Sequence, residues 1–122
     1  MTIRPPAHIE PYVRALGEED AMRFFLRFGG AELYIARDPK GRGRLEQELG
    51  TEAARRLAAL ADETMLPYRV PQPKPWMAEV MRSRGLPVVE IARSLHVTTV
   101  SVRNWLKKAD NGPREERQQR LF

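Results

Sequence analysis

The chain has 122 residues, a formal net charge of +5 from 21 Lys and Arg against 16 Asp and Glu, and no cysteine. This length allows one modest core or two small subdomains. The lack of cysteine excludes disulfides and thiolate metal sites. No apolar run approaches the ~20 residues of a membrane span, and the first residues lack the apolar stretch of a signal peptide, so we expect a cytoplasmic protein without membrane contact.

The N-terminal half contains an internal repeat. Residues 16–24 align with residues 49–57 at a shift of 33 residues, sharing Leu, Gly, Glu, Ala and Arg, and after one inserted residue Tyr34 falls opposite Tyr68. Apolar spacing predicts that each copy is a helix followed by a strand. The expected helices are 18–28 and 51–62, and the expected strands are 31–37 and 65–70.

The predicted strands imply a pairing partner. A lone strand with one apolar edge is not stable in water, so each must pair with the other copy or with a second chain. We therefore predict a homodimer whose interface includes Phe24, Phe28, Leu33, Tyr34 and Ile35.

A proline-rich segment separates two predicted domains. Residues 71–75 carry three prolines and predict a stiff linker, and Pro75 can occupy the first turn of a support helix that buries Met77, Val80 and Met81. The fold class is therefore predicted as mainly α. The predicted parts are a helix–strand repeat domain for dimerisation (1–70), the linker (71–75), a helix-turn-helix domain (76–109) and a basic tail (110–122).

The most informative segment is 88–107, whose spacing predicts a helix-turn-helix. A first helix over 88–95 would bury Val88, Ile91 and Leu95. His96 stands where such turns prefer glycine, and Thr98 is a good N-cap for a second helix over 99–108. The buried face of that second helix is predicted to comprise Val102, Trp105 and Leu106.

The charge distribution favours a polyanion partner for this segment. Basic and acidic residues number 11 and 11 before Pro71 and 10 and 5 from Pro71 onward, so the whole net charge lies in the half with the motif. We predict that double-stranded DNA is the partner. The predicted base-reading residues are Thr99, Val100, Arg103 and Asn104, and the predicted phosphate contacts are Thr98, Ser101, Lys107, Lys108, Arg93, Arg82 and Arg84.

A second basic element lies between the repeats. Residues 42–44 read Arg-Gly-Arg, a pattern found in hooks that enter the minor groove. Arg42 and Arg44 are the candidates for such a contact. The alternative is a flexible basic loop that joins the two repeats.

Other residue patterns give no support for catalysis or a cofactor. The acidic run 18–20 lies where a helix start favours negative charge, and His8 and His96 lie far apart without a metal-ligand spacing. No P-loop, nucleophile elbow or dinucleotide fingerprint is present. We therefore expect no metal, no cofactor and no enzymatic activity.

Segment 28–35 (Phe-Gly-Gly-Ala-Glu-Leu-Tyr-Ile), the Leu-Gly-x-Glu-x-Ala pattern and the C-terminal motif together resemble the Mor/C family of phage transcription activators. The resemblance covers about 13–108. It implies a sequence-specific regulator that dimerises through its N-terminal part and acts at phage promoters with RNA polymerase. In that family the strand is thought to approach the minor groove; Glu32 would repel phosphate there, so this contact is not carried over.

Two other classes remain open from the sequence. One is a phage DNA-packaging factor, similar to a small terminase subunit, although those proteins tend to place the DNA module first. The other is a pure interaction module without affinity for DNA.

Overall fold

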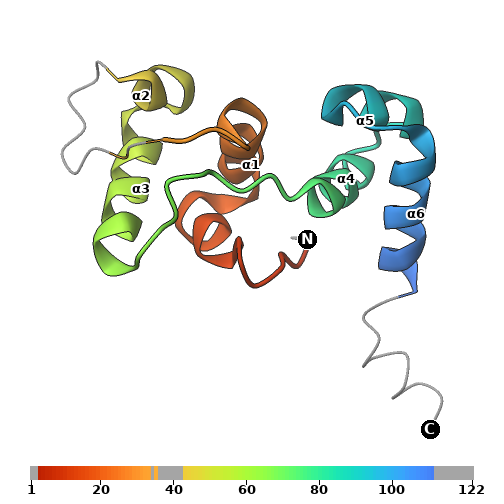
Figure 1. Ribbon diagram of the computed structural model, residues 1–122, viewed down its shortest axis with the longest axis horizontal. Coiled ribbons are helices and arrows are strands. Elements are labelled where there is room, and N and C mark those ends of the chain that lie inside the picture. The colour runs from red at the N-terminus through yellow and green to blue at the C-terminus, as the bar shows by residue number, and fades with distance from the viewer. Residues whose placement is uncertain (1–2, 34, 36–42, 112–122) are drawn as a thin grey trace, which may run out of the picture. The chain divides into compact units, whose positions relative to one another are not determined.

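The computed structural model describes residues 3–33, 35 and 43–111, and the fold is mainly α, as predicted (Figure 1). The chain divides into two compact units, Met1–Pro73 and Lys74–Phe122. The first unit contains helices α1 to α3, and the second contains α4 to α6. Their bounds are α1 Glu10–Phe28, α2 Arg44–Leu49, α3 Thr51–Glu63, α4 Lys74–Ser83, α5 Val88–Leu95 and α6 Thr99–Asp110.

Two glycines give the first unit its repeated form. Gly17 interrupts α1 with φ 83° and ψ 163°, and Gly50 separates α2 from α3 with φ 92° and ψ 159°. Only glycine adopts this backbone region without strain, because a Cβ would clash with the chain's own backbone. Each copy is thus a short helix, a glycine corner and a longer helix. The sequence analysis predicted neither short helix, that is, neither the segment of α1 before Gly17 nor α2.

The core of the first unit is aromatic. In α1, the ring of Phe24 lies 5.8 Å from that of Tyr12 and 5.7 Å from those of Phe25 and Phe28. These side chains are buried, and α1 packs against α3, which contributes Leu57. Burial raises the pKa of the Tyr12 hydroxyl. The large phenylalanine side chains of α1 therefore pack against the small alanine side chains of α3.

The sequence analysis predicted strands at 31–37 and 65–70, but no strand forms among residues 3–33, 35 and 43–111; residues 34, 36 and 37 of the first prediction lie outside this described part. Instead, the two extended segments meet at one antiparallel bridge between Glu32 and Arg69. The N–H of Leu33 donates to the carbonyl of Tyr68 at 2.8 Å, and the N–H of Val70 donates to that of Ala31 at 2.9 Å. We call residues 31–33, 35 and 65–70 the ribbon; in this structure its two segments pair within one chain.

In the second unit, α4 begins at Lys74, so the last two residues of the predicted linker are helical. Pro75 fits the first turn, where its missing N–H costs nothing. Trp76 is 1% exposed and is the largest fully buried side chain, beside Met77 and Val80 of the same helix. Ala92 and Val102 add α5 and α6 to this core. The sequence analysis predicted that Trp105 is buried, but this side chain is only half-buried.

Candidate nucleic-acid interface

The connection between α5 and α6 is a three-residue turn built on a left-handed residue. His96 has φ 57° and ψ 46°, the conformation expected of glycine at a helix C-terminus. The N–H of Val97 donates to the carbonyl of Ala92 at 3.0 Å, which returns the chain tightly over the end of α5. His96, for which the sequence predicts a left-handed backbone, is therefore the residue at which the chain turns.

The start of α6 is fixed by a side-chain cap. The N–H of Ser101 donates to Thr98 Oγ1 at 3.1 Å, and the hydroxyls of these two residues lie 3.1 Å apart. This bond satisfies one of the amides that a helix start leaves without a partner. Thr98 is therefore the N-cap, as the sequence predicts, and its hydroxyl already has a structural partner.

The four predicted base-reading residues lie on the outer side of α6. Val100 is 61% exposed, Arg103 and Asn104 are exposed, and Thr99 is half-buried. Val102 and Leu106 point the other way, into the core of the second unit. The helix thus presents a methyl group, an amide and a guanidinium within two turns of one face.

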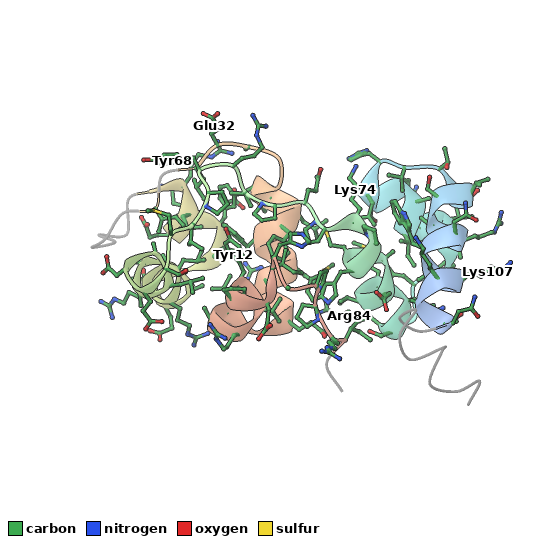
Figure 2. All side chains as sticks on the ribbon, turned by 60° about the horizontal axis from the view of Figure 1, so that its bottom comes forward. Tyr12, Glu32, Tyr68, Lys74, Arg84 and Lys107 are labelled. Atoms are coloured by element: carbon green, nitrogen blue, oxygen red, sulfur yellow. The ribbon has the colours of Figure 1, made fainter. Side chains whose placement is uncertain are left out.

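The predicted phosphate contacts on α6 continue this face toward its C-terminus. Lys107 and Lys108 are exposed, and Figure 2 shows Lys107 on the side of α6 that faces away from α4 and α5. Ser101 is half-buried. Cations in the last turn also suit the negative end of the helix dipole.

Two other predicted phosphate contacts are held by carboxylates. Arg93 donates from Nη2 to both carboxylate oxygens of Glu90, one turn earlier in α5. Arg82 donates from Nη1 and Nη2 to the two carboxylate oxygens of Asp110, at 3.0 and 2.7 Å. The hydrogen bonds that Arg82 donates to Asp110 raise the pKa of Arg82 and lower the pKa of Asp110, and those that Arg93 donates to Glu90 raise the pKa of Arg93.

The remaining basic candidates lie elsewhere. Arg84 is exposed just after α4. Arg42 falls outside the described residues. Arg44 begins α2, and its guanidinium lies 5.7 Å from the centre of the Phe28 ring. Arg44 is therefore helical and stacked on an aromatic ring, which differs from the extended hook that the sequence suggested.

The predicted dimer contacts are corrected in part. Phe24 and Phe28 are buried within the first unit, so they do not lie on a surface that a second chain could touch. Tyr34 falls outside the described residues. Leu33 and Ile35 are half-buried and line a hollow of about 210 Å³. The segment that follows α3, residues 65–68, also lines this hollow.

The sequence analysis missed two features of these surfaces. Met65 and Tyr68 are 96% and 73% exposed, and Figure 2 shows Tyr68 on the same ribbon as Glu32. The sequence analysis missed this exposure because it placed both residues in a predicted strand, 65–70. Asp110 was also missed, although a carboxylate in the last turn of a helix, where the dipole disfavours it, is a signal for a cationic partner.

Comparison with family models, with curated proteins and with solved structures finds no match. In the described part of the chain, no helix is long and apolar enough to cross a membrane, and no group of His, Asp and Glu side chains has the arrangement of a metal site.

Proposed function

We propose that α5 and α6 form a helix-turn-helix and that the protein is a sequence-specific regulator of transcription that binds double-stranded DNA. The observation that carries the proposal is the outer face of α6, with Val100, Arg103 and Asn104 followed by Lys107 and Lys108. Small and hydrogen-bonding groups at a helix start, with cations further along, suit insertion into a major groove flanked by phosphates. The excess of positive charge in this half of the chain supports a polyanion partner.

Each residue has a proposed role on the duplex. Arg103 donates two hydrogen bonds to a guanine, Asn104 pairs with an adenine edge, and Val100 contacts a thymine methyl group. Thr99 contacts a base edge at the helix start, and Lys107 and Lys108 neutralise phosphates. Weaker phosphate roles fall to Thr98 and Ser101, and to Arg93 and Arg84, which are exposed.

The resemblance to the Mor/C family suggests the biological setting. The proposed regulator acts in the cytoplasm at phage or prophage promoters, with RNA polymerase as a further partner, and catalyses no reaction. Two copies of the reading helix would occupy half-sites about one helical turn, ~34 Å, apart, so a dyad-symmetric operator is expected.

A homodimer is part of this proposal. The exposed Met65 and Tyr68, with Leu33 and Ile35 in the hollow beside them, offer the apolar surface that such a dimer would cover. Light scattering of the intact chain tests it: a dimer supports the regulator, whereas a large ring would favour a DNA-packaging role.

Selection of bound oligonucleotides from a random pool, at two salt concentrations, tests the function. An enriched common sequence is expected. Asn104→Ala should cost about 1–3 kcal/mol and relax the preference at one base pair, and Lys107→Gln should weaken all sequences alike. Arg55→Gln, which removes an exposed cation from α3, is the matched control and should leave binding unchanged. A pool without enrichment, or binding that is independent of salt, would contradict the proposal.

A further inference from the structure

The Arg82–Asp110 pair joins two helices that meet at the proposed DNA-binding unit. Arg82 lies in the last turn of α4, and Asp110 is the final residue of α6. The two parallel hydrogen bonds, 2.7 and 3.0 Å, form the fork geometry that fixes direction as well as distance. By contrast, Arg93 and Glu90 both belong to α5, so their pair links no second element.

The position of Asp110 makes this pair more than an incidental surface contact. A carboxylate at a helix C-terminus lies beside carbonyls that carry partial negative charge, which is unfavourable. Lys107 and Lys108 occupy the same last turn and are the cations that the dipole favours there. Asp110 nevertheless turns to α4, where the guanidinium of Arg82 offsets its charge.

A second carboxylate completes the cluster. Glu79 lies one turn before Arg82 in α4, and burial raises the pKa of Glu79, while the charge of Arg82 acts to lower it and that of Asp110 to raise it. With Glu79 and Asp110 ionised, these three side chains carry a net charge of −1. Because the charge of Arg82 is already offset by two carboxylates, Arg82 attracts a phosphate only weakly, and the net negative charge of the cluster repels a phosphate.

We propose that Arg82 is a positioning residue: its fork to Asp110 holds the last turn of α6 against α4, and it does not bind phosphate as the sequence predicts. The part of this inference that concerns DNA rests on the proposed function. The cations available to DNA on α6 are then Arg103, Lys107 and Lys108, so the N-terminal and middle turns of the helix define the binding face. The Glu79–Arg82–Asp110 cluster marks its boundary.

The first test needs no DNA. Both tryptophans of the chain, Trp76 and Trp105, lie in the second unit, so their fluorescence reports its unfolding. Arg82→Gln is expected to lower the melting temperature in the wild-type chain and to have no effect in an Asp110→Asn background. The matched pair Arg93→Gln and Glu90→Gln, confined to α5, should show a smaller coupling. An equal shift from Arg82→Gln in both backgrounds would overturn the proposal.

The second test measures the salt dependence of DNA affinity. Each phosphate contact contributes about 0.9 to the slope of log affinity against log salt concentration. Lys107→Gln should reduce the slope by about this amount, whereas Arg82→Gln should leave it unchanged. A reduction of about 0.9 by Arg82→Gln would show a phosphate contact and overturn the inference. If the wild-type chain binds no DNA, the proposed function fails, and the melting experiments still decide the positioning role.

Discussion

Replacement of His96 tests the turn on which the proposed reading helix depends. This residue holds φ 57° and ψ 46° at the end of α5, and its side chain is exposed. Substitution there changes the backbone preference while removing few contacts. The stability of the second unit should therefore follow the tolerance of each residue for the left-handed region, in the order Gly, Asn, His, Ala, Val.

The magnitude follows from two opposing terms. The left-handed conformation costs an ordinary residue about 1–2 kcal/mol, and histidine tolerates it better than most. Glycine removes this strain but loses about 0.5–1 kcal/mol through the greater freedom of the unfolded chain. His96→Gly should then stabilise by at most about 0.5–1 kcal/mol, and His96→Val should destabilise because its branched Cβ is least tolerant of this region.

Urea titration followed by tryptophan fluorescence measures the effect, because Trp76 and Trp105 both report on the second unit. With a denaturant slope of about 1 kcal/mol per molar urea, the midpoint should rise by at most ~0.5–1 M for His96→Gly. His96→Asn is the matched control, since its side chain remains polar and tolerates the same backbone. A lower midpoint for His96→Gly, or equal midpoints for Gly and Val, would refute the account of the turn.

Three further changes have expected outcomes. Gly50→Ala should cost about 1–3 kcal/mol in thermal unfolding followed by circular dichroism. This cost comes from backbone strain alone, because an added Cβ would meet no atom within 4 Å beyond residue 50 and its two chain neighbours; a neutral result would remove the case for a required glycine corner. Thr98→Ala should cost about 1 kcal/mol through the lost cap, whereas Thr98→Ser should retain it, as urea midpoints would register. Glu79→Gln should stabilise the second unit near neutral pH and lose this advantage in acid. Burial raises the pKa of Glu79, so protonated Glu79 stabilises the folded state below the unfolded pKa, and this stabilisation is lost as pH rises through the folded pKa. A gain for Glu79→Gln that is equal at all pH values would contradict this assignment.

Helices α3 and α5 were predictable because they depend on local spacing, whereas α2 and the part of α1 before Gly17 were not predicted. The predicted helix 51–62 is observed as Thr51–Glu63, and 88–95 is observed without change. Their apolar residues recur every three or four positions, a signal that tertiary context rarely overrides. The strands were not predictable, because alternation over six or seven residues cannot tell a strand from an extended segment that makes a single bridge.

Side-chain partners could be predicted less well than helices. The exposure of Arg103 and Asn104 follows from helical periodicity, because these residues lie on the side of α6 opposite to the buried Val102. The fork between Arg82 and Asp110 joins residues 28 positions apart, and no local pattern contains that pairing. Trp76 was missed as the main core residue, because the sequence analysis assigned the buried face of this helix to Met77, Val80 and Met81.

The ribbon of the first unit has the symmetry of the repeat. A shift of 34 residues, as between Tyr34 and Tyr68, relates Glu32 to Leu66 and Ile35 to Arg69. Under this shift the antiparallel pair Glu32–Arg69 maps onto the pair Leu66–Ile35, whose residue numbers have the same sum; the first of these two pairs forms the bridge in the structure. This is the relation that a two-fold axis imposes on identical segments of two chains.

One chain therefore satisfies internally the pairing that a single repeat would need a partner to achieve. The glycine corners agree, since Gly17 and Gly50 adopt nearly the same dihedral angles at equivalent positions. Phe24 and Phe28 are buried in the core that α1 forms with α3. The apolar surface of the first unit is therefore supplied by other side chains, and in its described part the most exposed of these is Met65.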